Sequence, residues 1–421
     1  MGNYKSFTEA SGLPFDPVSV EPYHSMEYFE QEREKIFARS WLSVGRVEEI
    51  PNAGDYMLRD IEICKTQIIV SRDKSGAINA YHNVCPHRGN LVMKAREGNA
   101  SLFVCGYHSW TFGLDGRLRG IPDEAGFPMI DKKTCGLKRA SCEVWNGFIF
   151  ISLAEPPDVT LKEFLGDMGE LLDGMVMPFA DNPIVLEATL QANWKVVMDA
   201  FSESYHVTSV HPTTIKDSFI WSGNPHGRAM EMEFLGLHRR SIITGNPGFA
   251  LGPHQKVAAL AAAADASAVS TTGNVFGGES MTVIAAMVEH PSINTIKADT
   301  WVNDLNMLFP NFHIDPSPGG FWTHQFWPIA PNRTRWVSNW YVPRPTTVRE
   351  RFQQELYLAN LAEIMVEDIG TTERVQLGIE SGAQPHLHLG DPDALIRHSL
   401  DQAQRFINAP SVSAALKDPG Q

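Results

Sequence analysis

The sequence predicts an α+β protein with an N-terminal β-sandwich and a larger C-terminal domain, in which an antiparallel sheet is flanked by helices. Short β-type runs follow one another from Trp41 to Ser152. Pro156-Pro157 then interrupts this pattern, and helical and strand-like periodicities are mixed beyond it. We therefore expect one domain over residues 40–156 and a second formed by residues 1–39 and 157–421.

Composition is that of a globular protein outside the membrane. The chain has 421 residues, of which 43% are hydrophobic and 20% charged. It contains no run of about eighteen apolar residues, which a membrane span would need. Its first residues lack a charged and then apolar signal pattern, and its five cysteines are too sparse for a disulfide scaffold. We expect a cytoplasmic protein with reduced thiols.

The net charge of −14 argues against nucleic acid as a partner, because no basic stripe covers the whole chain. One segment departs from this balance. Between Cys85 and Ala140 there are nine basic and five acidic residues, so this segment is positive within an acidic chain. Such asymmetry predicts that an acidic partner is steered toward this segment.

The expected elements of the first domain are short. A helix is predicted over Ser25–Arg39, and Asp115-Gly116 is a hairpin turn signal. The expected strands are Trp41–Gly45, Asp55–Arg59, Thr66–Ser71, Ala77–His82 and Val144–Ser152.

In the second domain, strands are expected over Met281–Val288, Met307–Pro310, Phe321–Trp327 and Thr334–Tyr341. Thr347 to Glu350 form a capping-box pattern that opens a helix. A final helix, capped by Asp391 or Asp393, is expected to run to about Asn408. The segment Gly245–Gly278 is rich in Ala, Ser, Thr and Gly, and either a lid over an active site or a surface loop fits it.

Two mixed pairs of metal-ligating residues carry the strongest chemical signal. Cys85-Pro-His87 and Cys105-Gly-Tyr-His108 each combine one cysteine with one histidine. Two thiolates on one iron and two imidazoles on the other make a Rieske [2Fe–2S] centre. Zinc is the alternative, although Cys2His2 zinc sites normally group the cysteines in one pair and the histidines in the other.

A second set of histidines follows in the larger domain. Glu203 and His206 are three residues apart and would share a helix face. His206 and His211 would diverge on a regular helix, so they converge on one metal only if the helix distorts or ends between them. Pro212 makes such an ending plausible. Two histidines and one carboxylate form the facial triad that holds non-haem Fe(II).

The carboxylate of such a triad would come from later in the chain. Glu367 and Asp368 lie inside an apolar, helix-like pattern, where an acid is costly unless a cation or donor meets it. An exposed charged edge of a helix would fit the same pair. The sequence alone leaves both readings open.

The chain resembles the large (α) subunit of the Rieske non-haem iron oxygenases, the aromatic-ring-hydroxylating oxygenase family. The resemblance covers most of the length and preserves the order of several motifs. These are Cys85-Pro-His87-Arg-Gly, Cys105-Gly-Tyr-His108-Ser-Trp, Asn193-Trp-Lys, Glu203-x-Tyr-His206-x4-His211, and Glu367-Asp368 with Glu373 and Gln376 after it.

The resemblance implies specific roles for these residues. It implies that His206, His211 and Asp368 bind the mononuclear iron, and that Glu203, where many members carry Asp, bridges the two metal centres. Asp199 occupies a position where many members have Asn or Asp. For the cluster, the ligands implied are Cys85, His87, Cys105 and His108.

The implied cofactors are a Rieske [2Fe–2S] cluster and mononuclear Fe(II), with O2 as co-substrate. The implied partners are a ferredoxin, a flavin reductase or both, together with a small organic substrate that is aromatic or otherwise apolar. Family members are trimers, so His108 of one subunit is expected to meet Glu203 of the next. A small β subunit is a further possible component.

Two functional hypotheses from different classes follow. The first is a terminal oxygenase component that mono- or dihydroxylates its substrate, with oxidative N- or O-demethylation as a variant. The second is a Rieske electron-transfer protein without oxygenase activity. The second metal site separates the two, because a carrier has no need for the His/His/carboxylate set or for the roughly 250 residues that contain it.

Overall fold

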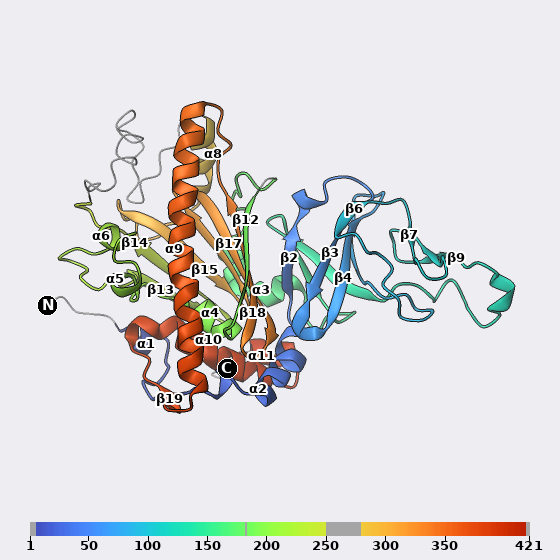
Figure 1. The fold of residues 1–421 in the computed structure, drawn as a ribbon, viewed down its shortest axis with the longest axis horizontal. Coiled ribbons are helices and arrows are strands. Elements are labelled where there is room, and N and C mark those ends of the chain that lie inside the picture. Colours follow the sequence, from blue (N-terminus) through green and yellow to red (C-terminus); the bar gives the residue numbers. More distant parts are fainter. Residues whose placement is uncertain (1–5, 182, 250–278, 418–421) are drawn as a thin grey trace. The chain divides into compact units, whose positions relative to one another are not determined.

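The computed structural model describes residues 6–181, 183–249 and 279–417. The chain divides into two compact units (Figure 1). The larger contains the residues up to Glu30 and Leu165–Arg405, and the smaller contains Gln31–Phe164 and the segment from Phe406 onward. The domain limits expected from the sequence, at residues 40 and 156, remain a prediction.

The smaller unit is built on an antiparallel sheet, which has seven strands among the described residues. Its order is β2 (Leu42–Arg46), β11 (Phe148–Ser152), β10 (Arg139–Trp145), β5 (Ile78–His82), β4 (Thr66–Arg72), β3 (Asp55–Ile61) and β6 (Glu97–Asn99). The strands predicted from alternating hydrophobic residues are present. Val144–Ser152 is split into β10 and β11 by a turn at Asn146-Gly147, where both residues have positive φ.

A second, three-stranded sheet of β7 (Phe103–Val104), β8 (Thr111–Phe112) and β9 (Leu118–Gly120) faces a shared core. The hairpin expected at Asp115-Gly116 connects β8 and β9. Aromatic and aliphatic side chains of both sheets pack into one cluster, which also contains Cys85 and Cys105. The two cysteines are thus fixed by the core of the sandwich.

The larger unit contains an antiparallel sheet that also has seven strands within the described ranges. Its order is β12 (Ile184–Leu190), β18 (Arg333–Tyr341), β17 (Gly320–Ala330), β16 (Phe312–Ser317), β15 (Trp301–Leu308), β14 (His238–Thr244) and β13 (Glu231–Leu235). The fold class predicted from the sequence is confirmed: a β-sandwich unit precedes a sheet flanked by helices.

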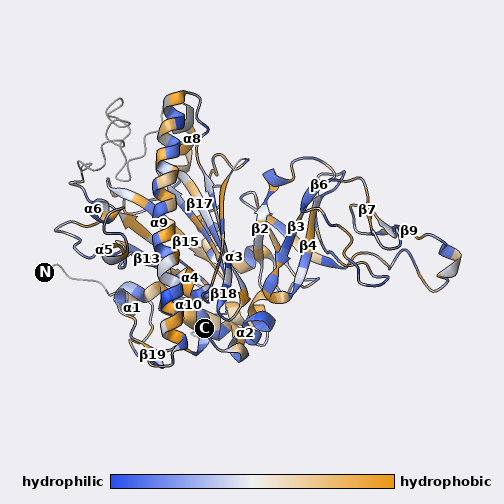
Figure 2. Cartoon of the chain, in the orientation of Figure 1, coloured by the Kyte–Doolittle hydropathy of each residue, from blue (hydrophilic) through white to orange (hydrophobic). Residues whose placement is uncertain are grey.

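Two helices define the functional face of this sheet. The short helix α4 (Trp194–Ala200) packs against β17 and β18, and the long helix α9 (Val348–Glu380) packs against α4. In Figure 1, α9 runs the length of the larger unit in front of the sheet. Polar and apolar residues are mixed along α9 (Figure 2), and several of its apolar side chains, among them Phe352, Val366 and Leu377, are exposed.

Local capping explains where several helices begin. The Thr347 side chain accepts a hydrogen bond from the Glu350 N–H, and Glu350 accepts one from the Thr347 N–H, so the predicted capping box is present. Ser25 accepts from the Tyr28 N–H at the start of α2 (Met26–Gln31). This helix continues as a π-helical stretch over Glu32–Phe37.

The C-terminal helix prediction is correct in part. Helix α10 (Ala394–Asn408) ends at the expected residue, but α11 (Val412–Leu416) follows it. Asp391 Oδ1 accepts hydrogen bonds from the Thr8 N–H and the Ser6 hydroxyl, and Asp393 Oδ2 accepts one from the Gly390 N–H. The final-helix prediction missed this anchoring of the N-terminal segment.

Two predicted strands differ from the structure. Of Met307–Pro310, only Met307 and Leu308 belong to a strand, β15, and Phe309 and Pro310 lie in the turn that follows. Met281–Val288 lies within helix α8 (Glu279–Val288), which packs against β16. Ile284 and Met287, three residues apart, are buried, whereas Val283 is exposed. The run of β-branched residues suggested a strand, but Ala285, Ala286 and Met287 favour a helix, and contact with the sheet stabilises it. The lid considered over Gly245–Gly278 lies largely outside the described residues.

None of the described helices is both long and apolar enough to cross a membrane. The structure has no disulfide at any of the five cysteines.

Candidate metal centres

A single helical turn brings His206 and His211 together. Helix α4 ends at Ala200, and the chain turns before the four-residue helix α5 (Val207–Val210). His206 is the N-cap of this turn and His211 is its C-cap. The predicted ending of helical geometry before Pro212 is therefore present, and it lets both imidazoles reach one point.

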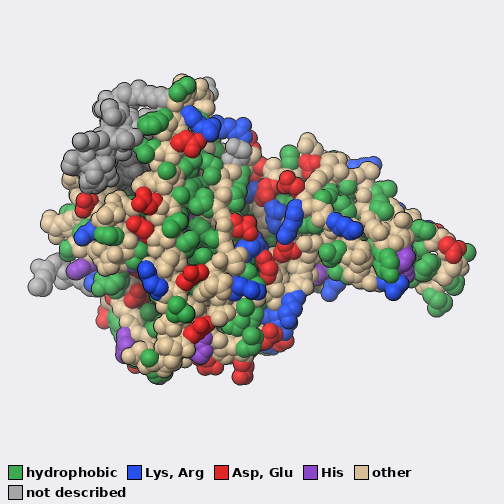
Figure 3. Space-filling model, viewed as in Figure 1, with side chains coloured by type: hydrophobic (Ala, Val, Ile, Leu, Met, Phe, Trp, Pro, Cys, Tyr) green, Lys and Arg blue, Asp and Glu red, His purple; other side chains and the backbone are tan. Residues whose placement is uncertain are grey.

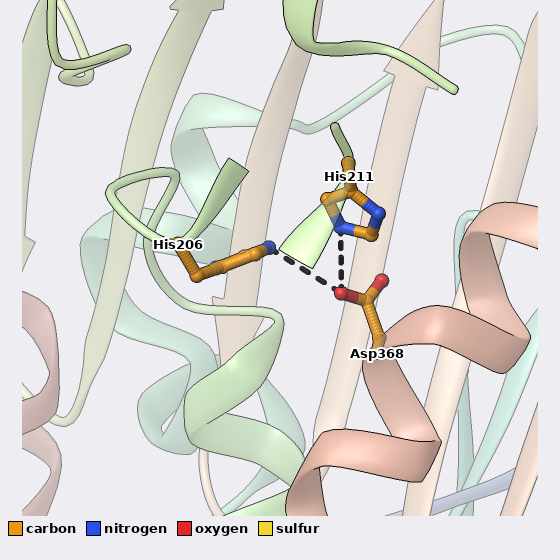
Figure 4. Close-up of side chains that lie close together, drawn as sticks. All are labelled: His206, His211 and Asp368. Carbon is orange, nitrogen blue, oxygen red and sulfur yellow. Dashed lines mark ion pairs between the residues drawn. The ribbon is translucent and has the colours of Figure 1, made fainter. Parts of the chain in front are cut away.

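The third group of this site comes from the middle of α9. Asp368 Oδ1 lies 3.3 Å from His206 Nε2 and 2.8 Å from His211 Nε2. Figure 4 shows both rings directed at this carboxylate. Among the described residues, these three form the only cluster of His, Cys, Asp and Glu compact enough for one metal ion. The structure thus unites three residues that lie up to 162 positions apart in the sequence.

Two further carboxylates hold the outer edges of the imidazoles. Glu203 Oε1 lies 2.6 Å from His206 Nδ1, and Glu367 Oε2 lies 2.6 Å from His211 Nδ1. The Thr214 hydroxyl also donates to Glu367 Oε2. Each imidazole is therefore held by a carboxylate at Nδ1 and presents Nε2 to the centre, the arrangement that orients metal-binding histidines.

Glu203 sits in the turn between α4 and α5 rather than on a shared helix with His206. Its second oxygen accepts hydrogen bonds from the backbone N–H groups of Tyr205 and His206. The helical spacing argument predicted the Glu203–His206 contact for the wrong reason. The contact forms because the carboxylate caps the start of the next helical turn.

The electrostatics of the site favour bound positive charge. Burial alone would lower the pKa of His206, but the Asp368 and Glu203 carboxylates raise it to about 10. The pKa of His211 is also raised, since Asp368 and Glu367 outweigh the effect of burial. The three carboxylates thus hold protons on the imidazoles, and a divalent cation at Nε2 would displace these protons.

The residues fit a mononuclear metal. Asp368 Oδ1 is buried and accepts no hydrogen bond of good geometry from the described residues, although both Nε2 atoms point at it. Two imidazoles and one carboxylate provide three ligands and leave other positions open. Glu367 was the sequence alternative to Asp368, and its place behind His211 shows that both acids of the pair have a part in the site.

The Cys/His pairs of the smaller unit form two matched loops. The Gly89 N–H donates to the Cys85 carbonyl and the Ser109 N–H donates to the Cys105 carbonyl, both at 2.9 Å. Gly89 and Ser109 both have positive φ, at 73° and 56°. A second pair of backbone hydrogen bonds also matches: Cys85 N–H to Asn90, and Cys105 N–H to Trp110.

Backbone N–H groups lie within hydrogen-bonding distance of the Cys85 and Cys105 sulfur atoms. Burial disfavours both thiolates, whereas the backbone N–H groups of His87 and Arg88 favour that of Cys85, whose pKa is raised on balance. Burial also opposes ionisation of Cys105, but N–H groups of Tyr107 and His108 help to lower its pKa. Donors to sulfur also tune the potential of an iron–sulfur cluster.

The two histidines of these loops lie closer to solvent than the cysteines. Cys85 and Cys105 are each 2% exposed, whereas His87 and His108 are partly exposed, with ring centroids 4.6 Å apart. Trp110 stacks on the His87 ring at 4.9 Å. Within the described ranges, no three of these four side chains have ligand atoms that all lie within 4.8 Å of one another, unlike those of His206, His211 and Asp368. A two-iron cluster fits this spread better than one tetrahedral zinc ion.

A cavity of about 250 Å³ adjoins the histidine–carboxylate site. Its wall includes Glu203, His206 and Asp368, and also the half-buried Asp199 and the buried Tyr23. The remaining lining is mostly aliphatic and comes from α4, α9, β19 (His386–Leu387), α10 and nearby loops.

The fold and both sites define a class of protein. Residues 40–132 match the family described as Rieske [2Fe-2S] domain, and residues 180–409 match the family described as ring hydroxylating alpha subunit (catalytic domain). The second match alone covers more than half of the chain. The chain belongs to the α subunits of the ring-hydroxylating Rieske non-haem iron oxygenases, a family that carries a Rieske cluster and a mononuclear iron.

Individual relatives differ in the reactions that their names state. The chain is 35% identical over 223 residues to the large oxygenase component of a naphthalene 1,2-dioxygenase system of Pseudomonas aeruginosa, covering 51% of this chain and 49% of that protein. It is 34% identical over 209 residues to a glycine betaine monooxygenase oxygenase subunit of the same species, covering 50% and 48%. The matched segments thus span about half the length of these curated relatives.

The solved structure of naphthalene 1,2-dioxygenase from a Rhodococcus species bound to indole has a similar fold, with a TM-score of 0.71. It is 22% identical, and the match covers 94% of this chain and 95% of that one. The likeness shows that the two chains share their fold across nearly their whole length.

Proposed function

We propose that this protein is the terminal oxygenase component of a Rieske system, which hydroxylates or dihydroxylates an organic substrate with O2. The observation that carries the proposal is the convergence of His206, His211 and Asp368 in a chain that also holds the two Cys/His loops. A Rieske electron carrier would have no use for this triad.

The geometry of the side chains supports the proposed ligand assignment. Cys85, Cys105, His87 and His108 would hold the [2Fe–2S] cluster, and His206, His211 and Asp368 would hold Fe(II). When bound, the cluster supplies single electrons and the mononuclear iron supplies dioxygen activation. The protein's own contribution is to orient the imidazoles through Glu203 and Glu367 and to leave part of the metal site open.

Metal analysis tests this assignment directly. We expect three irons and two acid-labile sulfides per chain, because the cluster needs two irons and the triad holds one. Iron, sulfide and zinc would be measured on protein purified without oxygen. Stoichiometric zinc without sulfide would contradict the cluster assignment, and two irons with two sulfides would leave the triad without its metal.

The names of the relatives indicate the class of reaction, an oxygenation with O2. The relatives include a protein named for dioxygenation of an aromatic hydrocarbon and one named for monooxygenation of a quaternary ammonium compound. We infer that the substrate is a small organic molecule, and the mostly aliphatic cavity favours one with a substantial apolar part. Product analysis against a panel of arenes and N-methyl compounds would separate a diol from an alcohol or a demethylated amine.

We propose that the protein works as a homotrimer in the cytoplasm, with Glu203 of one subunit facing His108 of its neighbour. Hydrophobic side chains are exposed on the face of the larger unit that carries α9 (Figure 3). On α9 itself, Val366 is 62% and Leu377 68% exposed. Tyr107, beside His108, is 53% exposed in the smaller unit. Exposed apolar surfaces next to both centres support docking between copies. Copurification of a second, smaller chain would show whether a β subunit belongs to the assembly.

The electron donor is proposed to be an acidic ferredoxin or the ferredoxin domain of a reductase. Part of the predicted basic surface is neutralised within the unit, since Lys132 pairs with Glu124 and Arg119 pairs with Asp115. Lys94 and Lys133 are exposed and have no ion pair among the described residues. These two lysines therefore support steering better than the segment's net charge does.

Reduction by the donor should slow as ionic strength rises, because the Debye length falls from ~10 Å at 0.1 M to ~3 Å at 1 M salt. We expect Lys94→Glu with Lys133→Glu to lower the association rate about tenfold at low salt. Lys162→Glu, a charge reversal of an exposed lysine on α3 (Leu161–Leu171), is the control. Stopped-flow reduction of the cluster gives the rate, and indifference to both salt and the double reversal would show that docking is apolar.

A further inference from the structure

One acidic side chain in the cavity has no part in the metal site as described. Asp199 lies in the last turn of α4 and lines the same cavity as Glu203, His206 and Asp368. The Tyr23 hydroxyl donates a hydrogen bond to Asp199 Oδ2 at 2.8 Å. Asp199 Oδ1 is buried and accepts no hydrogen bond from the described residues. Asp199 therefore lines the cavity and also has a buried oxygen that no described group satisfies.

The titratable and charged groups that act on Asp199 lie on four different parts of the chain. Lys195 lies on the same helix, Arg239 on β14, Tyr23 in the N-terminal segment, and Asp393 in the turn before α10. Burial raises the pKa of Asp199, whereas Tyr23, Arg239 and Lys195 oppose the rise, and the result is about 7. The carboxyl group can therefore exist in both protonation states near neutral pH.

The proposed reaction needs a proton source. Both monooxygenation and dihydroxylation consume two electrons and two protons for each O2, as atom and charge balance require. Among the described residues lining the cavity, the titratable side chains are Tyr23, Asp199, Glu203, His206 and Asp368. The last three are occupied with the imidazoles or with the metal position. Burial raises the pKa of Tyr23 well above 10, so its proton is not available.

We propose that Asp199, oriented by Tyr23, passes protons from cavity water to the mononuclear site during turnover. The inference rests on the proposed oxygenase function. In this step the Asp199 O–H bond breaks as its proton moves, through cavity water, to the oxygen that is being reduced. The resulting carboxylate then takes a proton from the water that connects the cavity to solvent. The cavity volume is sufficient for several water molecules, each of which takes up ~30 Å³ in the liquid.

A purely structural role for Asp199 makes different predictions. As a buried counter-ion of Lys195 and Arg239, it would stay ionised and its replacement would affect only stability. Infrared spectroscopy of the resting enzyme separates the two roles, because a protonated carboxyl group has a distinct C=O stretching band. We expect such a band to titrate in the neutral pH range and to be absent from Asp199→Asn.

Tyr23→Phe tests the orienting hydrogen bond. Loss of this donor removes an interaction that favours the carboxylate, so the midpoint of the band should move to higher pH. Tyr28→Phe is the matched control, because its ring lies as close to Lys195 Nζ as that of Tyr23, 5.4 Å against 5.7 Å, but Tyr28 does not line the cavity. The control should leave the midpoint unchanged.

The kinetic test uses a single turnover of the pre-reduced enzyme. In the wild type, product formation should be fast below the midpoint and slow as pH rises through it, since the protonated form is the donor. Asp199→Asn should be about 100-fold slower with a flat pH profile, while iron content and the affinity for substrate are unchanged. If the asparagine variant does not fold, the pH profile of Tyr23→Phe, shifted toward higher pH, carries the test.

The proton-relay role would be wrong if the wild type oxygenates its substrate and Asp199→Asn does so with the same rate and pH profile. The absence of any titrating carboxyl band would also overturn it. By contrast, a wild-type protein with both metals that oxygenates nothing would contradict the oxygenase proposal, and the infrared titration of Asp199 would still be measurable.

Discussion

Asp368→Ala is expected to remove the mononuclear iron and to bring product formation below detection, while the visible spectrum of the cluster stays intact. The reason is geometric, because Asp368 Oδ1 is the only carboxylate oxygen that both Nε2 atoms approach among the described residues. Without it, two imidazoles remain, and two neutral ligands hold Fe(II) weakly. Iron analysis, the visible spectrum and product assays on one preparation check this expectation.

Glu367→Gln is the matched control for this change. Glu367 is the next residue on α9 but contacts His211 Nδ1 rather than the centre, so its loss weakens the orientation of a ligand and not the ligand set. Loss of such an outer partner typically lowers metal affinity or activity by roughly 10- to 100-fold. If Asp368→Ala kept its iron while Glu367→Gln lost it, the two acids would have exchanged roles.

Glu203→Gln is expected to slow oxidation of the reduced cluster by about 100-fold while both metals stay bound. Glu203 holds His206 Nδ1 with one oxygen, and its side chain is 12% exposed. In the proposed trimer it also meets His108 of the neighbouring subunit. The amide keeps the size of the side chain but removes the charge that favours an N–H donor on both imidazoles.

Single-turnover measurements with the pre-reduced enzyme follow the cluster spectrum after O2 is added. The control is Glu373→Gln, whose carboxylate accepts a hydrogen bond from the Gln191 N–H and lies outside the cavity lining. A normal rate of cluster oxidation in Glu203→Gln would place the electron path elsewhere. A loss of mononuclear iron would show that Glu203 acts through His206 alone.

Local sequence patterns predicted the features that depend on interactions between residues close in sequence. The alternating strands, the capping box at Thr347 and the Cys/His loops are each set by residues a few positions apart. The helix α8 is the exception, because Val283 and Ile284 favour a strand locally while packing against β16 decides the outcome. The sequence contains no direct sign of this contact.

The triad was predictable only with the resemblance, since spacing left both Glu367 and Asp368 as candidates. On a helix, adjacent residues point about 100° apart, so one can face the metal position while the other reaches His211 from behind. Which acid does which depends on how α9 is rotated against α4, and that rotation is a tertiary property. Thr214 was missed for the same reason, because its hydroxyl contacts Glu367 across 153 residues of sequence.

The position of His206 and His211 at the two ends of α5 has a consequence for how the site tolerates change. The number of residues in this helical turn fixes the relative direction of the two imidazoles. Adding or deleting one residue between the histidines would rotate one imidazole by about 100°. Substitutions inside the turn should be far less harmful, because Thr208 and Ser209 are partly or fully exposed and only Val207 is buried. Loop grafting or directed evolution near this iron should therefore vary side chains at these two positions and preserve the number of residues.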